Sequence, residues 1–125
     1  MSDDRQDFVQ GLVAELRRGT ITIGVLSQLT NPKYGYALVE SLTAKGIPIE
    51  PGTLYPLLRR LEKQEVLTSE WETTGAKPRK YYVLSETGKQ IYRQMCKEWA
   101  DMNDNLKQLI EEAGFNERGG NDGKR

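Results

Sequence analysis

The hydrophobic pattern at the start of the chain has the spacing of an α-helix. The apolar residues that would share one helical face are Phe8, Val9, Leu12, Val13 and Leu16. Their spacing of three and four residues predicts an amphipathic helix over residues 4–18, which Gly19 is expected to interrupt. Segment 21–29 is rich in β-branched residues and could form a strand by propensity alone. Its length and its short connections favour a second, buried helix.

Another helix is predicted over residues 34–45. Leu38, Val39 and Leu42 fall on one face of this segment. Gly46 provides a C-terminal stop, because glycine readily adopts the left-handed conformation that often ends a helix. The two prolines and the glycine that come next are typical of a turn.

Segment 53–65 predicts a fourth helix, with Thr53 as its N-cap. Pro56 then falls in the first turn, where the missing N–H of proline costs little. Four leucines gather within one third of the helix circumference and would pack on a core. They are Leu54, Leu57, Leu58 and Leu61.

The opposite face of this helix is basic. Arg59 and Lys63 would point outward, with Arg60 on a flank. A helix fits the major groove of B-DNA, where the guanidinium of Arg59 could bond to guanine O6 and N7. Arg60 and Lys63 would more plausibly meet phosphates. Taken alone, these cations could equally form an ordinary solvated face.

After the helix over residues 53–65 the pattern alternates with a period of two. Residues 66–72 and 80–84 predict the two strands of a β-hairpin. Its connection is basic, since Lys77, Arg79 and Lys80 lie within four positions without an acid. Helix, turn, basic helix and basic hairpin, in that order, are the elements of a winged helix-turn-helix. The wing cations of such a fold can reach a minor groove or the nearby backbone.

The last predicted helix covers residues 85–113, with Ser85 as its N-cap. Its apolar residues follow one another in alternating steps of three and four, which is typical of a seam between helices. They are Tyr92, Met95, Trp99, Met102, Leu106, Leu109 and Ala113. Such a helix spans about 43 Å, more than a small globular body covers, so a second copy of the chain is expected to bury the seam. Residues 116–125 are rich in glycine and polar residues, and we expect a disordered tail.

Charge is unevenly distributed, although the chain has 18 basic and 18 acidic residues. Residues 1–16 carry a balance of −3, residues 17–85 a balance of +4, and residues 86–125 a balance of −1. Phosphate binding depends on local potential rather than on net charge. The basic middle of the chain is therefore compatible with DNA binding.

The chain contains no histidine, which excludes several chemistries. Neither a Ser-His-Asp nor a Cys-His site can be drawn, and no imidazole can bind a metal. No paired carboxylates fall on a segment expected to form a cleft, so we expect no enzyme, no cofactor and no metal site. Cys96 is the single cysteine, which fits a reducing compartment. No signal peptide or membrane-spanning stretch is recognised, so a cytoplasmic location is expected.

Three blocks of the sequence occur in a specific order: YGYAL at 34–38, PGTLYPLLRRLE at 51–62 and PRKYYVLSETG at 78–88. Together they resemble the PadR family of bacterial transcriptional regulators. The resemblance covers about residues 19–99 and implies a dimeric winged-helix repressor that binds operator DNA. It also implies release by a small molecule, often an aromatic one. The DNA-contacting set implied by position is Tyr36, Thr53, Tyr55, Arg59, Arg79 and Lys80.

The tyrosines and Trp99 each have a second interpretation. The resemblance implies that Tyr36 and Tyr55 act through phosphates, but either ring could simply pack at the edge of the core. In one multidrug-sensing branch of the family, the interface tryptophan of each subunit sandwiches a planar ligand, and the segment around Trp99 is similar to it. That branch has an acid four positions later, where this chain has Asn103. Trp99 is also the large apolar residue that a dimer seam requires, and this is the simpler interpretation.

These patterns together predict a mainly α-helical fold with a small β-hairpin wing. Its expected parts are an N-terminal helix that contributes to the dimer (1–18), a winged helix-turn-helix (19–85), a dimerisation helix (86–115) and the tail (116–125). The expected function is sequence-specific regulation of transcription by a homodimer on an inverted-repeat operator, with half-sites about 34–36 Å apart. The alternative is a winged helix that contacts other proteins instead of DNA.

Overall fold

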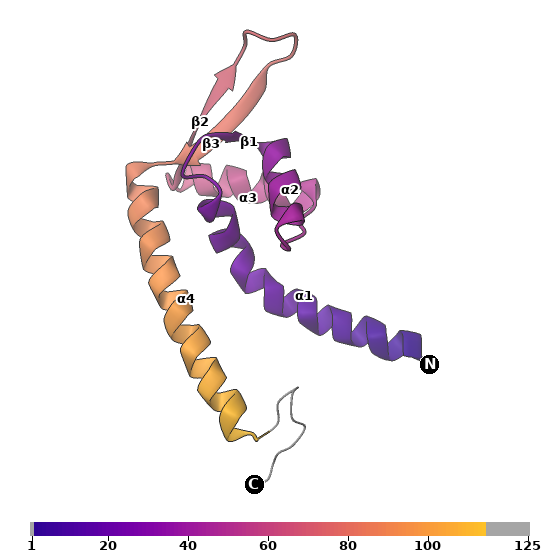
Figure 1. Ribbon diagram of the computed structural model, residues 1–125. Helices are drawn as coiled ribbons and strands as arrows, with labels where there is room; N and C mark the ends of the chain where they lie inside the picture. The colour runs from indigo at the N-terminus through magenta and orange to yellow at the C-terminus, as the bar shows by residue number, and fades with distance from the viewer. Residues whose placement is uncertain (1, 115–125) are drawn as a thin grey trace. The chain divides into compact units, whose positions relative to one another are not determined.

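A computed structural model describes residues 2–114, which form four helices and one small sheet (Figure 1). The predicted mainly helical fold with a hairpin is confirmed, while the tail expected at 116–125 lies outside the described residues. The elements in chain order are α1 (Ser2–Ser27), β1 (Lys33–Tyr34), α2 (Gly35–Ala44), α3 (Pro51–Lys63), β2 (Leu67–Glu72), β3 (Arg79–Leu84) and α4 (Glu86–Glu112).

The chain divides into two compact units, with the boundary inside α4 between Tyr92 and Arg93. The first unit contains α1, α2, α3, the sheet and the first turns of α4. The second unit contains the remainder of α4. Because α4 has 27 residues, its axis is about 40 Å long.

The core of the first unit is built mainly from leucine. The C-terminal part of α1, one face of α2 and the leucine stripe of α3 pack together and against one face of the sheet. Each fully buried leucine contributes about 1.5–3 kcal/mol relative to an exposed one. The largest fully buried side chains are Leu26, Leu29, Leu38, Leu42, Leu54, Leu58, Leu67 and Val25.

Helix α1 runs without a break through Gly19, so the expected interruption is wrong. Nothing lies within 4 Å of the position that a β-carbon on Gly19 would occupy. A glycine inside a helix costs only about 1 kcal/mol relative to alanine. Burial of Val25 and Leu26 at the far end of the same helix offsets that cost. The helical interpretation of segment 21–29 was correct up to Ser27.

Helix α3 begins two residues before the predicted N-cap. Pro51 is its first residue, and the carbonyl of Glu50 accepts hydrogen bonds from the N–H groups of Thr53 and Leu54, both at 2.9 Å. Proline suits this first position because its φ angle is already helical and its missing N–H would have no partner. Thr53 therefore lies in the first turn with its side chain exposed, and Pro56 lies inside the helix.

Helices α2 and α3 end in the same hydrogen-bonding pattern. At the end of α2, Gly46 has a φ angle of 92° and Ile47 N–H donates to the carbonyl of Leu42 at 2.8 Å. At the end of α3, Glu65 has a φ angle of 66° and Val66 N–H donates to the carbonyl of Leu61 at 2.9 Å. Both are Schellman motifs. The predicted stop at Gly46 is confirmed, and α3 ends at Lys63 rather than at 65.

The sheet has three antiparallel strands in the order β1-β3-β2, one more than the sequence predicted. The additional strand is β1, in which Lys33 pairs with Tyr82 and Tyr34 pairs with Tyr81. Tyr34 was expected to begin a helix, but α2 begins one residue later. The wing hairpin is therefore joined through β3 to the residues that immediately precede α2.

The predicted cap of α4 is confirmed. The Ser85 hydroxyl accepts a hydrogen bond from Gly88 N–H at 2.8 Å, which satisfies one free donor of the first turn. The same hydroxyl donates to the carbonyl of Glu65 at 2.7 Å. Gly88 has to be glycine, because a β-carbon there would lie 2.0 Å from the carbonyl oxygen of Val66.

Candidate nucleic-acid interface

The exposed face of α3 is basic, as predicted. Its leucine stripe faces the core, with Leu54 and Leu58 completely buried. The side chains of Arg59, Arg60 and Lys63 are exposed. Within residues 2–114 none of these three cations forms an ion pair. Their charge is therefore available to an external anion.

The N-terminal ends of α2 and α3 approach each other closely through Gly35 and Tyr55. A β-carbon on Gly35 would lie 2.5 Å from Cε1 and 2.7 Å from the hydroxyl oxygen of Tyr55. Tyr55 is half-buried in this contact. Tyr36, which follows Gly35 in the chain, is 64% exposed, so its ring is not part of the core. The structure thus places two tyrosines and the exposed Thr53 at neighbouring helix ends.

A cluster around Tyr34 lies at the loop end of the two wing strands. The guanidinium of Arg79 lies 4.5 Å above the Tyr34 ring centre, a cation–π contact. The Tyr34 hydroxyl donates a hydrogen bond to Oε1 of Glu72, the residue opposite Arg79 in the hairpin. Arg79 is exposed despite these neighbours, and so is Lys77 in the loop. Two of the three predicted wing cations, Lys77 and Arg79, are therefore accessible.

This cluster shifts the pKa values of its members. The hydrogen bond from Tyr34 lowers the pKa of the Glu72 carboxyl, with help from Thr74 and the charge of Arg79. The same hydrogen bond raises the pKa of the Tyr34 hydroxyl. The neighbouring Tyr81 also has a raised pKa, mainly because of the Glu70 charge. The tyrosines therefore remain neutral donors and Glu72 remains a carboxylate acceptor.

Lys80 is placed differently from the other predicted contacts. Its ammonium lies 3.1 Å from Oε1 of Glu62 on α3, and its side chain is only 27% exposed. The ammonium also lies 5.3 Å from the ring centre of Tyr82 and 5.9 Å from that of Trp71. Lys80 thus has a partner inside the protein, whereas Arg79 next to it does not have an ion pair within the described residues.

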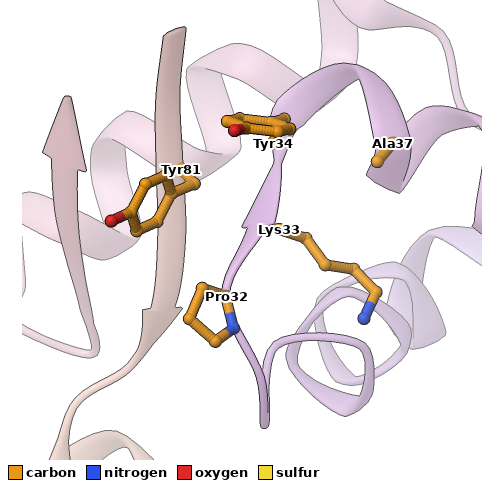
Figure 2. Close-up of a pocket in the computed structure, with 5 residues that line it drawn as sticks. All are labelled: Pro32, Lys33, Tyr34, Ala37 and Tyr81. Carbon is orange, nitrogen blue, oxygen red and sulfur yellow. The ribbon is translucent and has the colours of Figure 1, made fainter. Parts of the chain in front are cut away.

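A shallow depression lies beside the short strand β1 (Figure 2). It is lined by Pro32, Lys33, Tyr34, Ala37 and Tyr81. The Tyr34 and Tyr81 rings meet edge to face with their centres 5.8 Å apart. Figure 2 shows the Lys33 side chain directed away from these two rings. The depression contains no residue of α4 and thus does not include Trp99.

The apolar stripes of the two long helices are exposed in the single chain. On α1, Phe8 is 69% exposed and Leu16 is 72% exposed. On α4, Trp99 is 47% exposed, and Met102, Leu106 and Leu109 are each more than half exposed. Two other predicted seam residues, Tyr92 and Met95, are half-buried. Exposed stripes of this size are typical of surfaces that bind another protein.

Neither a membrane segment nor a metal cluster is found in the part of the chain that the structure describes. No helix between residues 2 and 114 combines the length and the apolar character that crossing a bilayer requires. In the same range, no three carboxylate or thiol side chains are grouped so that they could hold a metal ion.

Several residues that shape this surface were not identified from the sequence. Gly35 and Glu62 stand in recognised blocks, but neither was assigned the contact that the structure shows. Glu72 and Ser69 were placed only as strand residues. The close contact of Gly35 with Tyr55, and the pairing of Glu62 with a strand residue, join positions 20 and 18 residues apart in the chain. Such contacts depend on how the elements pack, which no local pattern encodes.

Comparison with known proteins agrees with this geometry. The sequence matches the Transcriptional regulator PadR-like family over residues 23–94. The crystal structure of a PadR family transcriptional regulator from Eggerthella lenta is 51% identical and covers 86% of this chain and 96% of that one, with a TM-score of 0.83. A PadR-like transcription factor from Bacteroides fragilis is 29% identical over 79% of this chain and 98% of that one, with a TM-score of 0.66.

A sequence relative carries a corresponding name. Transcriptional regulator Rv3488 of Mycobacterium tuberculosis is 32% identical over 76 residues, which are 60% of this chain and 71% of that protein. The family match spans more than half of the chain and covers α2, α3 and the wing. This chain therefore belongs to the PadR-like family of DNA-binding transcriptional regulators.

Proposed function

We propose that the chain is a sequence-specific regulator whose helix α3 enters the major groove of operator DNA. One observation carries the proposal: the leucine face of α3 is buried in the core, while Arg59 is exposed and without an ion pair among residues 2–114. A helix anchored in this way fixes the backbone from which Arg59 projects, so that its guanidinium can reach guanine for bidentate bonding. A regulator acts where the chromosome lies, so we place the protein in the bacterial cytoplasm.

The surrounding polar groups would position α3 through the DNA backbone. Arg60 and Lys63 flank Arg59 on the same helix and are exposed. Thr53 and the tyrosines at 36 and 55 lie at helix N-terminal ends, where hydroxyl groups commonly bond phosphates. In the wing, Lys77 and Arg79 would reach the adjacent minor groove or its phosphates. Contacts of this kind add affinity and orientation, and Arg59 adds sequence preference.

We further propose that the active form is a homodimer. The support is the exposed apolar stripe along α4, which includes Trp99, Leu106 and Leu109, and the second stripe on residues 2–18 of α1. Two copies that bury these stripes would form a symmetric pair of DNA-binding units. Such a pair binds an inverted repeat with half-sites about 34–36 Å apart. In this proposal residues 19–85 bind DNA, and residues 86–115 hold the two copies of the dimer together.

We also propose that the dimer represses transcription and is released by a planar aromatic effector at Trp99. A half-exposed indole on a helix seam offers a stacking surface for such a molecule. A ligand that binds more tightly when the copies are displaced would lower operator affinity by linkage. Titration of planar aromatics against the fluorescence of a Trp71→Phe variant, which leaves Trp99 as its tryptophan, tests this step. Unchanged emission across the panel would contradict it.

Selection from a pool of randomised duplexes tests the central proposal. We expect the full chain to enrich an inverted repeat, and its affinity to fall steeply as salt rises, because several phosphates release their counterions. Enrichment of asymmetric single sites would contradict the symmetric dimer. If no sequence is enriched and duplex binding is absent at low salt, the alternative of a winged helix that contacts proteins is favoured.

A further inference from the structure

Glu62 connects α3, the helix proposed to enter the major groove, to both strands of the wing. Its Oε2 accepts a hydrogen bond from the Ser69 hydroxyl on β2 at 2.5 Å. Its Oε1 pairs with the Lys80 ammonium on β3 at 3.1 Å. One carboxylate on α3 therefore bonds to β2 with one oxygen and to β3 with the other.

The environment of this carboxylate favours its charged form. The Glu62 and Lys80 side chains are only 32% and 27% exposed, so solvent screens this pair less than it screens the other ion pairs among the described residues. The hydrogen bond from Ser69 and the contact with Lys80 lower the pKa of Glu62 against the opposing effect of burial. The connection is thus intact at neutral pH.

The contacts of Glu62 lie on the face of the wing hairpin that also carries Trp71. Trp71 lies directly opposite Lys80 in the hairpin and is 62% exposed. The Lys80 ammonium lies between Glu62 and the rings of Trp71 and Tyr82. Arg79, one position earlier, faces the other side of the strand, where it stacks on Tyr34. The two neighbouring cations consequently have different surroundings.

We propose that Glu62 is a positioning residue for DNA binding. It does not contact DNA, but it holds the wing at a fixed orientation to α3, so that Arg59 and the wing cations engage the same duplex together. Lys80 is then a structural partner of Glu62 and not a phosphate contact. This inference rests on the proposed DNA binding for its consequence, but the fixed orientation itself can be measured without DNA.

The first experiment uses hydrogen exchange of the free protein. The variant Glu62→Gln keeps the shape of the side chain and removes its charge. We expect faster exchange in β2 and β3 and unchanged exchange in α2. The control is Glu65→Gln, because Glu65 lines a second surface depression together with Glu62 and Ser69, but its side chain has no partner among residues 2–114. Exchange in the wing equal to that of the unmodified chain would overturn the proposal.

The second experiment uses the duplex that the unmodified chain selects. Removing a negative charge near DNA strengthens binding if only electrostatics act. We expect the opposite for Glu62→Gln, a loss of about tenfold, because a charged hydrogen-bonded contact is lost and the wing is no longer held. Glu65→Gln should bind as well as the unmodified chain or better. Equal or tighter binding by Glu62→Gln would overturn the proposal.

A charge exchange separates positioning from direct contact and remains informative if Glu62→Gln folds poorly. Lys80→Glu alone places two carboxylates together and should weaken binding strongly. Adding Glu62→Lys restores an ion pair with reversed sign, and we expect most of the affinity to return. If Lys80 touches phosphate directly, the double variant binds no better than Lys80→Glu. Failure of the unmodified chain to bind any duplex would refute the proposed function. The hydrogen-exchange measurement on the free protein would then decide alone whether Glu62 holds the wing.

Discussion

The ring of Tyr55 occupies the space in which a β-carbon on residue 35 would lie, with Cε1 only 2.5 Å from that position. Gly35→Ala must therefore displace the ring, which is the outer part of a side chain and can move. We expect a stability loss of about 1–3 kcal/mol, as for other overpacked sites, together with weaker DNA binding. Thermal unfolding and duplex titration measure the two effects.

The matched control for Gly35→Ala removes the ring instead of displacing it. In a Tyr55→Ala background the space is open, so alanine at position 35 should cause little further loss of stability or affinity. Additive effects of the two substitutions would show that the close contact is not the cause.

Two other glycines should respond in opposite directions. Gly88→Ala brings a β-carbon to 2.0 Å from the Val66 carbonyl, which belongs to the backbone and cannot rotate away. We expect a loss of more than about 3 kcal/mol. Gly19→Ala has open space and lies inside α1, so it should stabilise the protein by about 0.5–1 kcal/mol. A loss of stability at position 19 would argue that α1 is broken there. Chemical denaturation measures both changes.

Arg59 and Lys63 should differ in what they contribute to DNA binding. Arg59→Ala is expected to cost about 1–3 kcal/mol on the selected duplex and to relax the preference at one base position. Lys63→Ala should weaken all duplexes alike and reduce the slope of affinity against salt by about 0.9. Titrations of selected and scrambled duplexes at several salt concentrations distinguish the two. Equal losses on both duplexes for Arg59→Ala would contradict a base contact.

The hydrogen bond from Tyr34 to Glu72 predicts a pH-dependent contribution to stability. Because this bond lowers the pKa of Glu72, its contribution is present above the ordinary pKa of a glutamate and is lost as the pH falls through the lowered value. Because it raises the pKa of Tyr34, the contribution is lost again only as the pH rises through the raised value near the alkaline end.

Tyr34→Phe should therefore be less stable than the unmodified chain at about pH 7, and the difference should shrink toward about pH 3. Unfolding curves across this range provide the measurement. Tyr81→Phe is the control, since it leaves the hydrogen bond between Tyr34 and Glu72 in place. A difference that stays constant with pH would contradict the assigned cause.

The proposed dimer predicts a specific effect of charge on the α4 seam. Leu106 is 51% exposed in the single chain, so a glutamate is tolerated there in the monomer but would be buried in the dimer. Leu106→Glu should shift the protein from dimer to monomer and weaken operator binding. Gln108→Glu adds the same charge two residues on, away from the seam, and should remain dimeric. Sedimentation measures both, and a dimeric Leu106→Glu variant would refute this interface.

The sequence predicted those features of the fold that depend on local periodicity. The leucine stripe of α3, the hairpin, the Gly46 stop and the Ser85 cap follow from spacing and residue type, and all are present. The helix break predicted at Gly19 was wrong. Burial of side chains further along α1 outweighs the small free-energy cost of a glycine inside a helix.

Features that depend on contacts between elements were missed. Strand β1 has only two residues and exists because β3 offers it a free edge. Lys80 resembles Arg79 in the sequence, but the alternation of a strand directs it to the opposite face and toward Glu62. Composition therefore indicated a basic wing. Only the packing shows that Lys77 and Arg79 are accessible while Lys80 is paired with Glu62.

The Ser85 junction has a mechanical consequence. Its hydroxyl binds the carbonyl of Glu65 while it caps α4, and Gly88 leaves no free space against Val66. A rotation of the first turn of α4 cannot be absorbed at this point without breaking those bonds. The first turn of α4 is therefore joined directly to the residues that follow α3, through bonds that involve neither wing cation nor the loop of the hairpin.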